Sequence, residues 1–445
     1  MNEEHGHEGQ LKRSVSLFSI TMYGIGNILG AGIYALIGNV VGETGNFSWM
    51  AFIIAAVTGG LTGLSYAELS TMFPQSAAEY VYAEKAFNKK ILSFVLGWII
   101  ICTGFFSAAT VALSFANYLG DLMGISSHFM NIAIAIILIV VLSLVNYIGI
   151  RESTWTNVIF TIIEAFGLIF IIAIGIPKIG SVNYFEMPPN HGLIALFSSV
   201  ALIFFAYIGF EDIANIAEEV KNPGKNLSRS LLISLVVTTA LYCLVSISIV
   251  GILDYDLIAS SPAPLKEVAT TAIGPIGGWL LSFIALFATA NTVLIILIVT
   301  SRMIYGMARD NALPSSLSRV SDTRKTPTIA VFVTMAVVVG LMFLGDVKLV
   351  AEASVFGVLV IFFIVNISLI ALRKNKPEIE RPFKLRPSIK WVPVIALIGA
   401  AACIFVLFFT YNFWNMIIQA IMIGVGLLVY FLLKIRKKGS NYEDG

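Results

Sequence analysis

The chain has 445 residues, of which 58% are hydrophobic and only 12% are charged, and its net charge is +2. Its mean hydropathy is +0.90. Because soluble globular domains carry about 25% charged residues, this composition excludes a soluble protein and predicts an all-α integral membrane protein that crosses the bilayer many times.

Apolar runs long enough to cross a bilayer as a helix, about 20 residues, recur along the whole chain. Twelve spans are expected, at residues 15–41, 48–73, 91–118, 129–149, 155–176, 192–217, 227–252, 276–308, 327–345, 349–372, 391–410 and 413–435. The connections are short, so no segment outside the membrane is long enough to form a separate domain. We therefore expect one transmembrane domain over residues 1–435 and a cytoplasmic tail over 436–445.

The basic residues predict the orientation of these spans. If the N-terminus is cytoplasmic, 25 of the 28 Lys and Arg residues fall on the inner side, and only Lys178, Lys266 and Lys348 fall outside. Cytoplasmic loops are enriched in Lys and Arg, so both termini are expected in the cytoplasm. The same alternation supports an even number of spans.

The first span has a composition that disfavours a continuous helix. Gly24, Gly26, Gly30 and Gly32 lie in its middle with Asn27 among them, and each glycine costs a helix interior roughly 1 kcal/mol relative to alanine. Within a bilayer, broken backbone is tolerated only where protein or a watery cavity receives its N–H and C=O groups. The segment therefore predicts a discontinuous helix with a binding site at the break. The alternative is that the small residues let a neighbouring helix pack closely.

The sixth span shows a second interruption. Its apolar run leads through the sequence AYIGF at 206–210 into Glu211 and Asp212, and acidic residues inside a span are costly unless they line water or face a partner. This span lies five after the first and crosses in the opposite direction, which is the pattern of an inverted repeat. We expect repeat one at about 15–176, repeat two at about 192–372, and two additional helices at about 391–435.

Several motifs resemble those of the amino acid–polyamine–organocation (APC) transporters. They are GNILGAGIY at 26–34, YAEL at 66–69, FFAYIGFE at 204–211, EEVKNP at 218–223 and YGMARDNALP at 305–314. They follow the family's order along most of the chain. The family often has Gly-Gly where this chain has Ala77-Ala78. The resemblance implies a leucine-transporter-like fold of two five-helix inverted repeats with discontinuous helices 1 and 6.

The resemblance also implies how a free amino acid is held at the two breaks. Carboxylate contacts come from the first break, between a helix half that ends near Ile28 and one that begins near Gly32, and ammonium contacts come from the backbone of the second break. The implied substrate-binding residues are Ile28, Gly30, Ala31 and Gly32 in the first span, and Phe205, Ala206 and Ile208 in the sixth. Helix ends supply the required groups, since N-termini present free N–H groups to anions and C-termini present free carbonyls to cations.

Glu164 lies near the middle of the otherwise apolar fifth span. Several proton-linked members of the family have lysine at the matching position, where its ammonium is implied to replace a sodium ion beside the first and eighth spans. A buried carboxyl can bind a proton near neutral pH, because burial disfavours its charged form. We therefore expect Glu164 to carry a coupled proton. The alternatives are a neutral Glu164 that only hydrogen-bonds a neighbouring helix, and a cation site with Thr289 or Asn291 of the eighth span.

The residues around the second break have two interpretations each. Glu211 and Asp212 either select a cationic side chain or form a gate, or they stabilise the first turn of the helix that follows through its dipole. Tyr207 and Phe210 are candidates to close over the substrate, and packing is the alternative. Glu68, close to the end of the second span, is expected to pair with a basic loop residue.

These features predict a secondary active transporter that moves L-amino acids across the cell membrane by alternating access and is coupled to protons. The alternatives are an amino acid exchanger without proton coupling and a non-transporting amino acid sensor. An enzyme is not expected, because no nucleophile–base set, metal-ligand cluster or phosphate loop occurs in the sequence. The expected partners are the amino acid, protons or a coupling cation, and the lipid bilayer; neither a cofactor nor nucleic acid is expected.

Overall fold

The computed structural model describes residues 11–124, 127–189, 192–261, 263–343, 348–409 and 413–443. Within these ranges, eight helical segments are long and apolar enough to cross a membrane by length and composition. Four shorter apolar helices accompany them, at Leu193–Phe204, Thr328–Leu341, Val394–Phe409 and Gln419–Ile435. The prediction of an all-α, multi-pass membrane protein is therefore confirmed.

Most helices that correspond to expected spans begin and end close to the predicted boundaries, but the helix of the sixth span ends at Phe204 instead of residue 217, because the second break follows it. The helices are α1 (Leu17–Thr44), α2 (Ser48–Met72), α4 (Lys90–Met123), α5 (His128–Ile148), α6 (Ile150–Gly175), α7 (Leu193–Phe204), α9 (Pro223–Ile252), α12 (Pro275–Arg309), α13 (Thr328–Leu341), α14 (Lys348–Asn375), α15 (Val394–Phe409) and α16 (Phe413–Glu443). The last helix continues past residue 435, so the segment expected as a tail extends α16 as far as Glu443. The end of the span expected at 327–345 lies outside the described residues.

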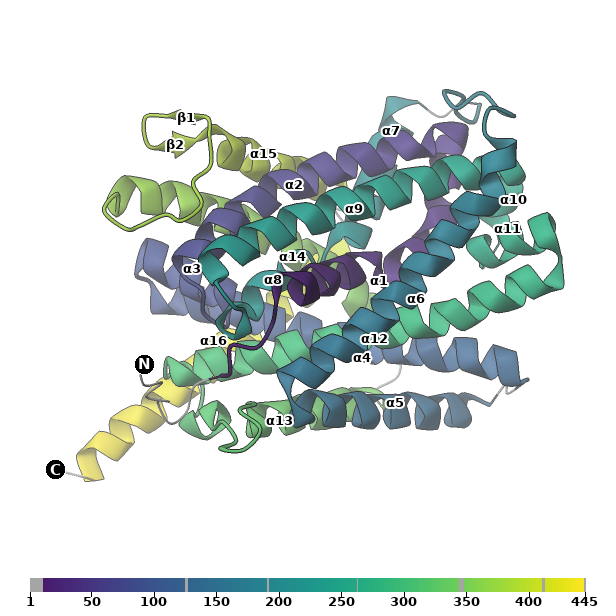
Figure 1. Cartoon of the computed structure of the whole chain (residues 1–445). Coiled ribbons are helices and arrows are strands. Elements are labelled where there is room, and N and C mark those ends of the chain that lie inside the picture. The colour runs from purple at the N-terminus through teal and green to yellow at the C-terminus, as the bar shows by residue number, and fades with distance from the viewer. Residues whose placement is uncertain are drawn as a thin grey trace, which may run out of the picture.

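Short elements connect the long helices. They are α3 (Ala78–Phe87), α8 (Asp212–Asn215), α10 (Tyr255–Ser260), α11 (Pro264–Ile273), the 3₁₀ turns η1 (Gly45–Phe47), η2 (Ile176–Lys178), η3 (Phe205–Tyr207), η4 (Ala217–Glu219) and η5 (Ser315–Ser318), and the strands β1 (Ser388–Ile389) and β2 (Val392–Pro393). The two strands pair as an antiparallel hairpin. In Figure 1 this hairpin and α3 lie at one end of the helix bundle, and α10 and α11 lie at the other.

α1 runs through the middle of the bundle, where it packs against α6, α7, α9 and α12 (Figure 1). α12 is also internal: 78% of its most apolar 18-residue stretch is buried inside the protein, whereas only 28% of the corresponding stretch of α5 is buried. The side chains of Phe129 and Ile137 on α5 are accordingly exposed. An apolar exterior of this kind is stable when it faces lipid and is rare on a soluble monomer.

Both interruptions predicted from the sequence occur. α1 leaves helical geometry at Gly30, where φ is 4° and ψ is −157°. In the sixth span α7 ends at Phe204, one 3₁₀ turn follows, and Gly209 adopts a φ of +121°, in the region that L side chains rarely enter. The helix after this second break is much shorter than expected, because α8 has four residues and gives way to η4.

The segments that flank the two broken spans also pair with each other. Val15, just before α1, and Val220, just after η4, form a parallel backbone bridge. The backbone N–H of Ser14 donates to the carbonyl of Glu219 at 3.0 Å, and that of Lys221 donates to the carbonyl of Val15 at 2.9 Å. The first and sixth spans are therefore joined at their ends as well as at their breaks.

Candidate functional site

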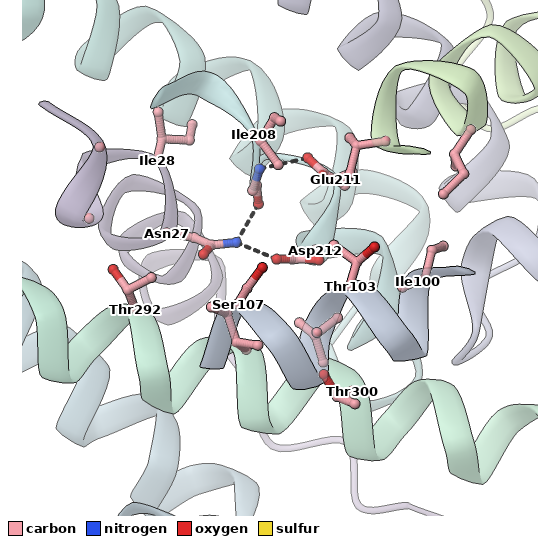
Figure 2. A pocket seen from close by; sticks show the side chains of 18 of the residues that line it. Asn27, Ile28, Ile100, Thr103, Ser107, Ile208, Glu211, Asp212, Thr292 and Thr300 are labelled. Carbon is pink, nitrogen blue, oxygen red and sulfur yellow. Dashed lines mark hydrogen bonds between the residues drawn. The ribbon is translucent and has the colours of Figure 1, made fainter. Parts of the chain in front are cut away.

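A cavity of about 170 Å³ lies at the two breaks. A cavity of about 150 Å³ is large enough to bind benzene, so this one can hold a small molecule. Its wall combines the broken backbone with side chains from α4, α12 and α14 (Figure 2). The lining residues from the two broken spans are Asn27, Ile28, Gly30, Gly32, Ala206, Ile208, Gly209, Glu211 and Asp212.

The two breaks are in direct contact. A Cβ atom added at Gly32 would lie 2.9 Å from Cα and 3.0 Å from Cβ of Ala206, which is closer than side chains pack. A Cβ added at Gly30 would lie 2.6 Å from Oγ1 of Thr292 on α12. Glycine is therefore required sterically at position 32, where the neighbouring atoms include backbone, whereas at position 30 the only close atom is the hydroxyl oxygen of a side chain. The break and the close packing of small residues, which the sequence offered as alternatives, occur together.

Tyr242 on α9 connects the broken backbones. Its hydroxyl donates to the carbonyl of Ile28 at 2.5 Å and lies 3.3 Å from the carbonyl of Ala206. The Ile28 carbonyl thus has a hydrogen-bond donor within the protein. Because the backbone groups at a break must be satisfied inside the membrane, Tyr242 stabilises the interruption.

Asn27 bridges the two spans through its side-chain amide. Nδ2 donates to the carbonyl of Gly209 and to Oδ2 of Asp212, each at 2.6 Å, as Figure 2 shows. A Cβ at Gly209 would lie 2.7 Å from this Nδ2. The amide, the glycine and the carboxylate form one packed unit that fixes the geometry of the second break.

The remaining residues predicted around the second break divide into two groups. Ile208 and Glu211 line the cavity. Tyr207 and Phe210 are fully buried and do not line it: the Tyr207 hydroxyl donates to the carbonyl of Phe52 at 3.2 Å, and the Phe210 ring packs against other aromatic rings. In this structure both aromatic residues act in packing. The side chains of Ala31 and Phe205 lie outside the described residues.

Among the described residues, three acidic side chains line the cavity. Glu211 is 7% exposed and accepts a hydrogen bond from the N–H of Gly209 at 2.8 Å. Asp212 accepts from Asn27, as described above. Glu79 on α3 accepts from the hydroxyl of Tyr66 at 3.0 Å and from the amide of Asn215 at 3.2 Å. Burial raises the pKa of Glu79, and the donated hydrogen bonds oppose that rise.

Sequence reasoning missed the hydroxyl groups on the opposite wall. Thr103 and Ser107 are four residues apart on α4, so they share one helix face. Thr292 and Thr300 are eight residues apart on α12 and share a face for the same reason. Polar residues at helical spacing inside apolar spans were the available signal, but only the fold shows that α4 and α12 pack together and present these hydroxyls to one cavity.

Glu164 lies outside the cavity, in a polar cluster between α6 and α12. The Asn157 amide donates to Asn291 Oδ1 at 2.8 Å, and Asn291 Nδ2 donates to Thr161 Oγ1 at 3.2 Å. Asn291 is within reach of the Glu164 carboxyl, yet neither carboxyl oxygen has a well-formed hydrogen bond in the described part of the chain. The hydroxyl of Thr289 bonds to carbonyls of its own helix.

The first span packs directly onto this cluster. A Cβ at Gly26 would lie 1.9 Å from Oγ1 of Thr161 and 2.7 Å from Nδ2 of Asn291. The cluster is therefore in contact with α1, one turn before its break.

Two buried ion pairs stabilise other parts of the bundle. Arg302 on α12 donates to Glu219 at 2.9 Å, and both side chains are 0% exposed. Arg373 at the end of α14 donates to both carboxyl oxygens of Glu68, and Arg381 lies 3.4 Å from that carboxylate. The predicted pairing of Glu68 with basic residues is confirmed. Burial raises the pKa of Glu219, whereas the neighbouring guanidinium lowers it.

A family model described as amino acid permease matches residues 15–432 of this chain. The branched-chain amino acid permease BcaP of Bacillus subtilis (strain 168) is 29% identical over 447 residues, covering 96% of this chain and 94% of the relative. The methylthioribose transporter of the same organism is 30% identical over 446 residues, with coverage of 95% and 93%. The mitochondrial cationic amino acid transporter 3 of Arabidopsis thaliana is 30% identical over 402 residues, with coverage of 85% and 65%. The chain therefore belongs to the amino acid permeases of the APC superfamily, and it is a transporter protein rather than an enzyme.

Proposed function

We propose that the protein is a secondary active transporter that moves L-amino acids across the cell membrane by alternating access. The observation that carries the proposal is the meeting of two broken helices at one small cavity, with Gly32 packed against Ala206. A small rotation of one helix group against the other changes which side of such a cavity is open. Relatives named as a branched-chain amino acid permease and a cationic amino acid transporter support an amino acid as the substrate.

The substrate's charged groups bind at the two breaks. The carboxylate accepts hydrogen bonds from the N–H groups that begin the second half of α1, around Ala31 and Gly32, beside Ile28 and Gly30. The ammonium donates to carbonyls of the irregular segment from Phe205 to Ile208. Desolvating a charged group costs several kcal/mol unless it is paired, and broken helix ends offset that cost for both ends of an amino acid.

The twelve helices form two inverted repeats of five, α1–α6 and α7–α14 with their connecting elements, followed by α15 and α16. The equivalent positions of the breaks, in the first and sixth spans, support this layout. The distribution of Lys and Arg supports cytoplasmic placement of both termini.

Glu164 carries the coupled proton. Its carboxyl is 0% exposed and has no well-formed hydrogen bond among the described residues, and the cluster around it contacts Gly26 of the first span. Neutralising this carboxyl removes a buried charge beside α1, so proton binding favours one arrangement of that helix over the other. The alternative is coupling to a cation that is bound by Glu164 and Asn291. Thr289 can bind this cation only if its hydroxyl gives up its hydrogen bonds to the backbone of α12.

The test is uptake of a panel of labelled amino acids into proteoliposomes, with and without an inward proton gradient, by the wild type and Glu164→Gln. We expect gradient-driven accumulation by the wild type. The variant is expected to lose accumulation but to retain exchange. Uptake that ignores the gradient in both proteins would refute proton coupling and identify an exchanger. A sodium-dependent, proton-independent uptake would identify the cation alternative. A sensor would bind amino acids without moving them.

A further inference from the structure

Apart from Glu164 in its polar cluster, the acidic side chains that the described residues enclose in the bundle fall into two groups. Glu68 and Glu219 have arginine partners, Arg373 and Arg302, at hydrogen-bonding distance. The three acidic side chains that line the cavity have no ion-pair partner among the residues that the structure describes; they are Glu79, Glu211 and Asp212. Since a buried charge is costly unless it is paired, the difference between the groups points to a cation that the protein itself does not supply.

The cavity acids are held by neutral donors. Asp212 accepts from the Asn27 amide and Glu211 accepts from the Gly209 N–H. No described side chain donates a hydrogen bond to Glu211, which is 7% exposed and faces the cavity (Figure 2). Neutral donors orient a carboxylate without cancelling its charge, so both groups keep acceptor capacity for a ligand.

The cavity wall formed by α4 also contains a polar group that lacks a hydrogen bond to any described residue. The hydroxyl of Thr103 on α4 is buried and has no hydrogen-bond partner within the described ranges, and it faces the cavity beside Ser107. Buried hydroxyls are normally hydrogen-bonded. Among the described lining residues, Lys, Arg and His are absent, so the cavity wall carries three carboxyl groups and hydroxyl acceptors but no basic group to balance them.

The substrate's α-ammonium does not account for this pocket. In the proposed binding mode that group is held by backbone carbonyls at the second break, and it brings one positive charge. Glu211 and Asp212 follow the break at successive positions, and Glu79 comes from a different element, α3. A second positive group on the ligand matches the remaining acceptors.

We propose that the cavity selects amino acids whose side chain carries a positive charge, with Asp212 and Glu211 as the counter-charges of that group. The inference rests on the proposed amino acid transport and specifies its substrate class. Asn27 then acts as a positioning residue, because its amide holds the Asp212 carboxylate beside the first break.

Lysine and norleucine provide a matched pair of ligands, since norleucine has the same carbon chain and lacks only the side-chain ammonium. The experiment measures how each unlabelled compound inhibits uptake of labelled lysine and of labelled leucine into proteoliposomes that contain the full-length protein. For the wild type we expect lysine to inhibit at a concentration at least tenfold lower than norleucine. Asp212→Asn keeps the side-chain size and an acceptor for Asn27, and it should reduce that ratio at least tenfold. Asp256→Asn, at an exposed position on α10, is the matched control and should leave the ratio unchanged.

Each outcome is decisive. Norleucine that inhibits as well as lysine, or a leucine uptake that lysine does not affect, would overturn the inference while leaving amino acid transport intact. An unchanged ratio in Asp212→Asn would overturn the assignment of that carboxylate. If the wild type takes up no amino acid at all, the proposed function fails and the inference fails with it. Should Asp212→Asn not fold, the wild-type comparison of the two ligands still decides the substrate class.

Discussion

Gly32→Ala is the substitution that tests the contact between the two breaks. The added methyl group would lie 2.9 Å and 3.0 Å from Cα and Cβ of Ala206. Ordinary carbon–carbon contacts are about 3.5–4.0 Å, so the two backbones must separate by roughly 0.5–1 Å. Overpacking of this kind costs about 1–3 kcal/mol, and the opposing gain from replacing glycine in a helix is only about 0.5–1 kcal/mol.

This cost acts on the arrangement that forms the cavity. At about 1.4 kcal/mol for each factor of ten, a cost of 1–3 kcal/mol weakens substrate binding by about 5- to 150-fold if the bound arrangement carries all of it. The assay is the concentration dependence of uptake into proteoliposomes, together with the apparent melting temperature in detergent. We expect a higher half-saturating concentration with little change in melting temperature.

Gly60→Ala on α2 is the matched control, because a Cβ at that position meets nothing within 4 Å. It should transport as the wild type does. Wild-type uptake by Gly32→Ala would refute the contact between the breaks. An equal loss of transport in both variants would show that the effect is not specific to the breaks.

Two further predictions follow from buried contacts. Arg302→Met leaves Glu219 buried without its partner, so it should destabilise the fold by about 3–5 kcal/mol and lower the melting temperature. The control, Arg319→Met at an exposed position, should change stability by at most about 0.5 kcal/mol. Similar melting temperatures for the two variants would contradict this prediction. Gly209→Ala places a side chain at φ +121° and against the amide of Asn27. The backbone strain alone costs about 1–3 kcal/mol, so we expect amino acid uptake to decrease. Normal uptake would show that the second break is not fixed as described.

The sequence predicted the long helices well because their boundaries depend on local properties, namely the length of apolar runs and the residues that end them. The first break was predicted for the same reason, since its glycine cluster acts locally, and the second was predicted from Gly209 and the acidic residues that follow it. The short α8 could not be predicted in this way. Its geometry depends on Asn27, which is 185 residues from its hydrogen-bond partner Asp212, and hydropathy carries no information about such a pair.

Ala77 illustrates the same limit. It adopts a left-handed backbone conformation, with φ 59° and ψ 50°, immediately before α3. Glycine enters this conformation without steric cost, which explains why the family often has glycine here. In this chain the alanine side chain is fully buried, and it packs so closely on Gly306 that a Cβ there would lie 2.7 Å away. Tertiary packing therefore stabilises a conformation that local propensity disfavours.

The candidate site was predicted in part. The residues on the two broken spans followed from motif and composition, and those with described side chains mostly line the cavity. The hydroxyls of α4 and α12 and the bridging Tyr242 were missed, because their roles exist only where distant helices meet. Glu164 was identified as a buried carboxyl, but its neighbours Asn157 and Thr161 appeared only in the fold.

The central claim, that the protein moves amino acids through this cavity, is tested most directly by counterflow. Purified protein is reconstituted in vesicles preloaded with an excess of unlabelled amino acid, and entry of a trace of the labelled compound is followed with no ion gradient. Alternating access predicts a transient accumulation of label above the external concentration, which Gly32→Ala diminishes and Gly60→Ala preserves. Stoichiometric binding of label with no accumulation inside the vesicles would contradict the account and identify a sensor.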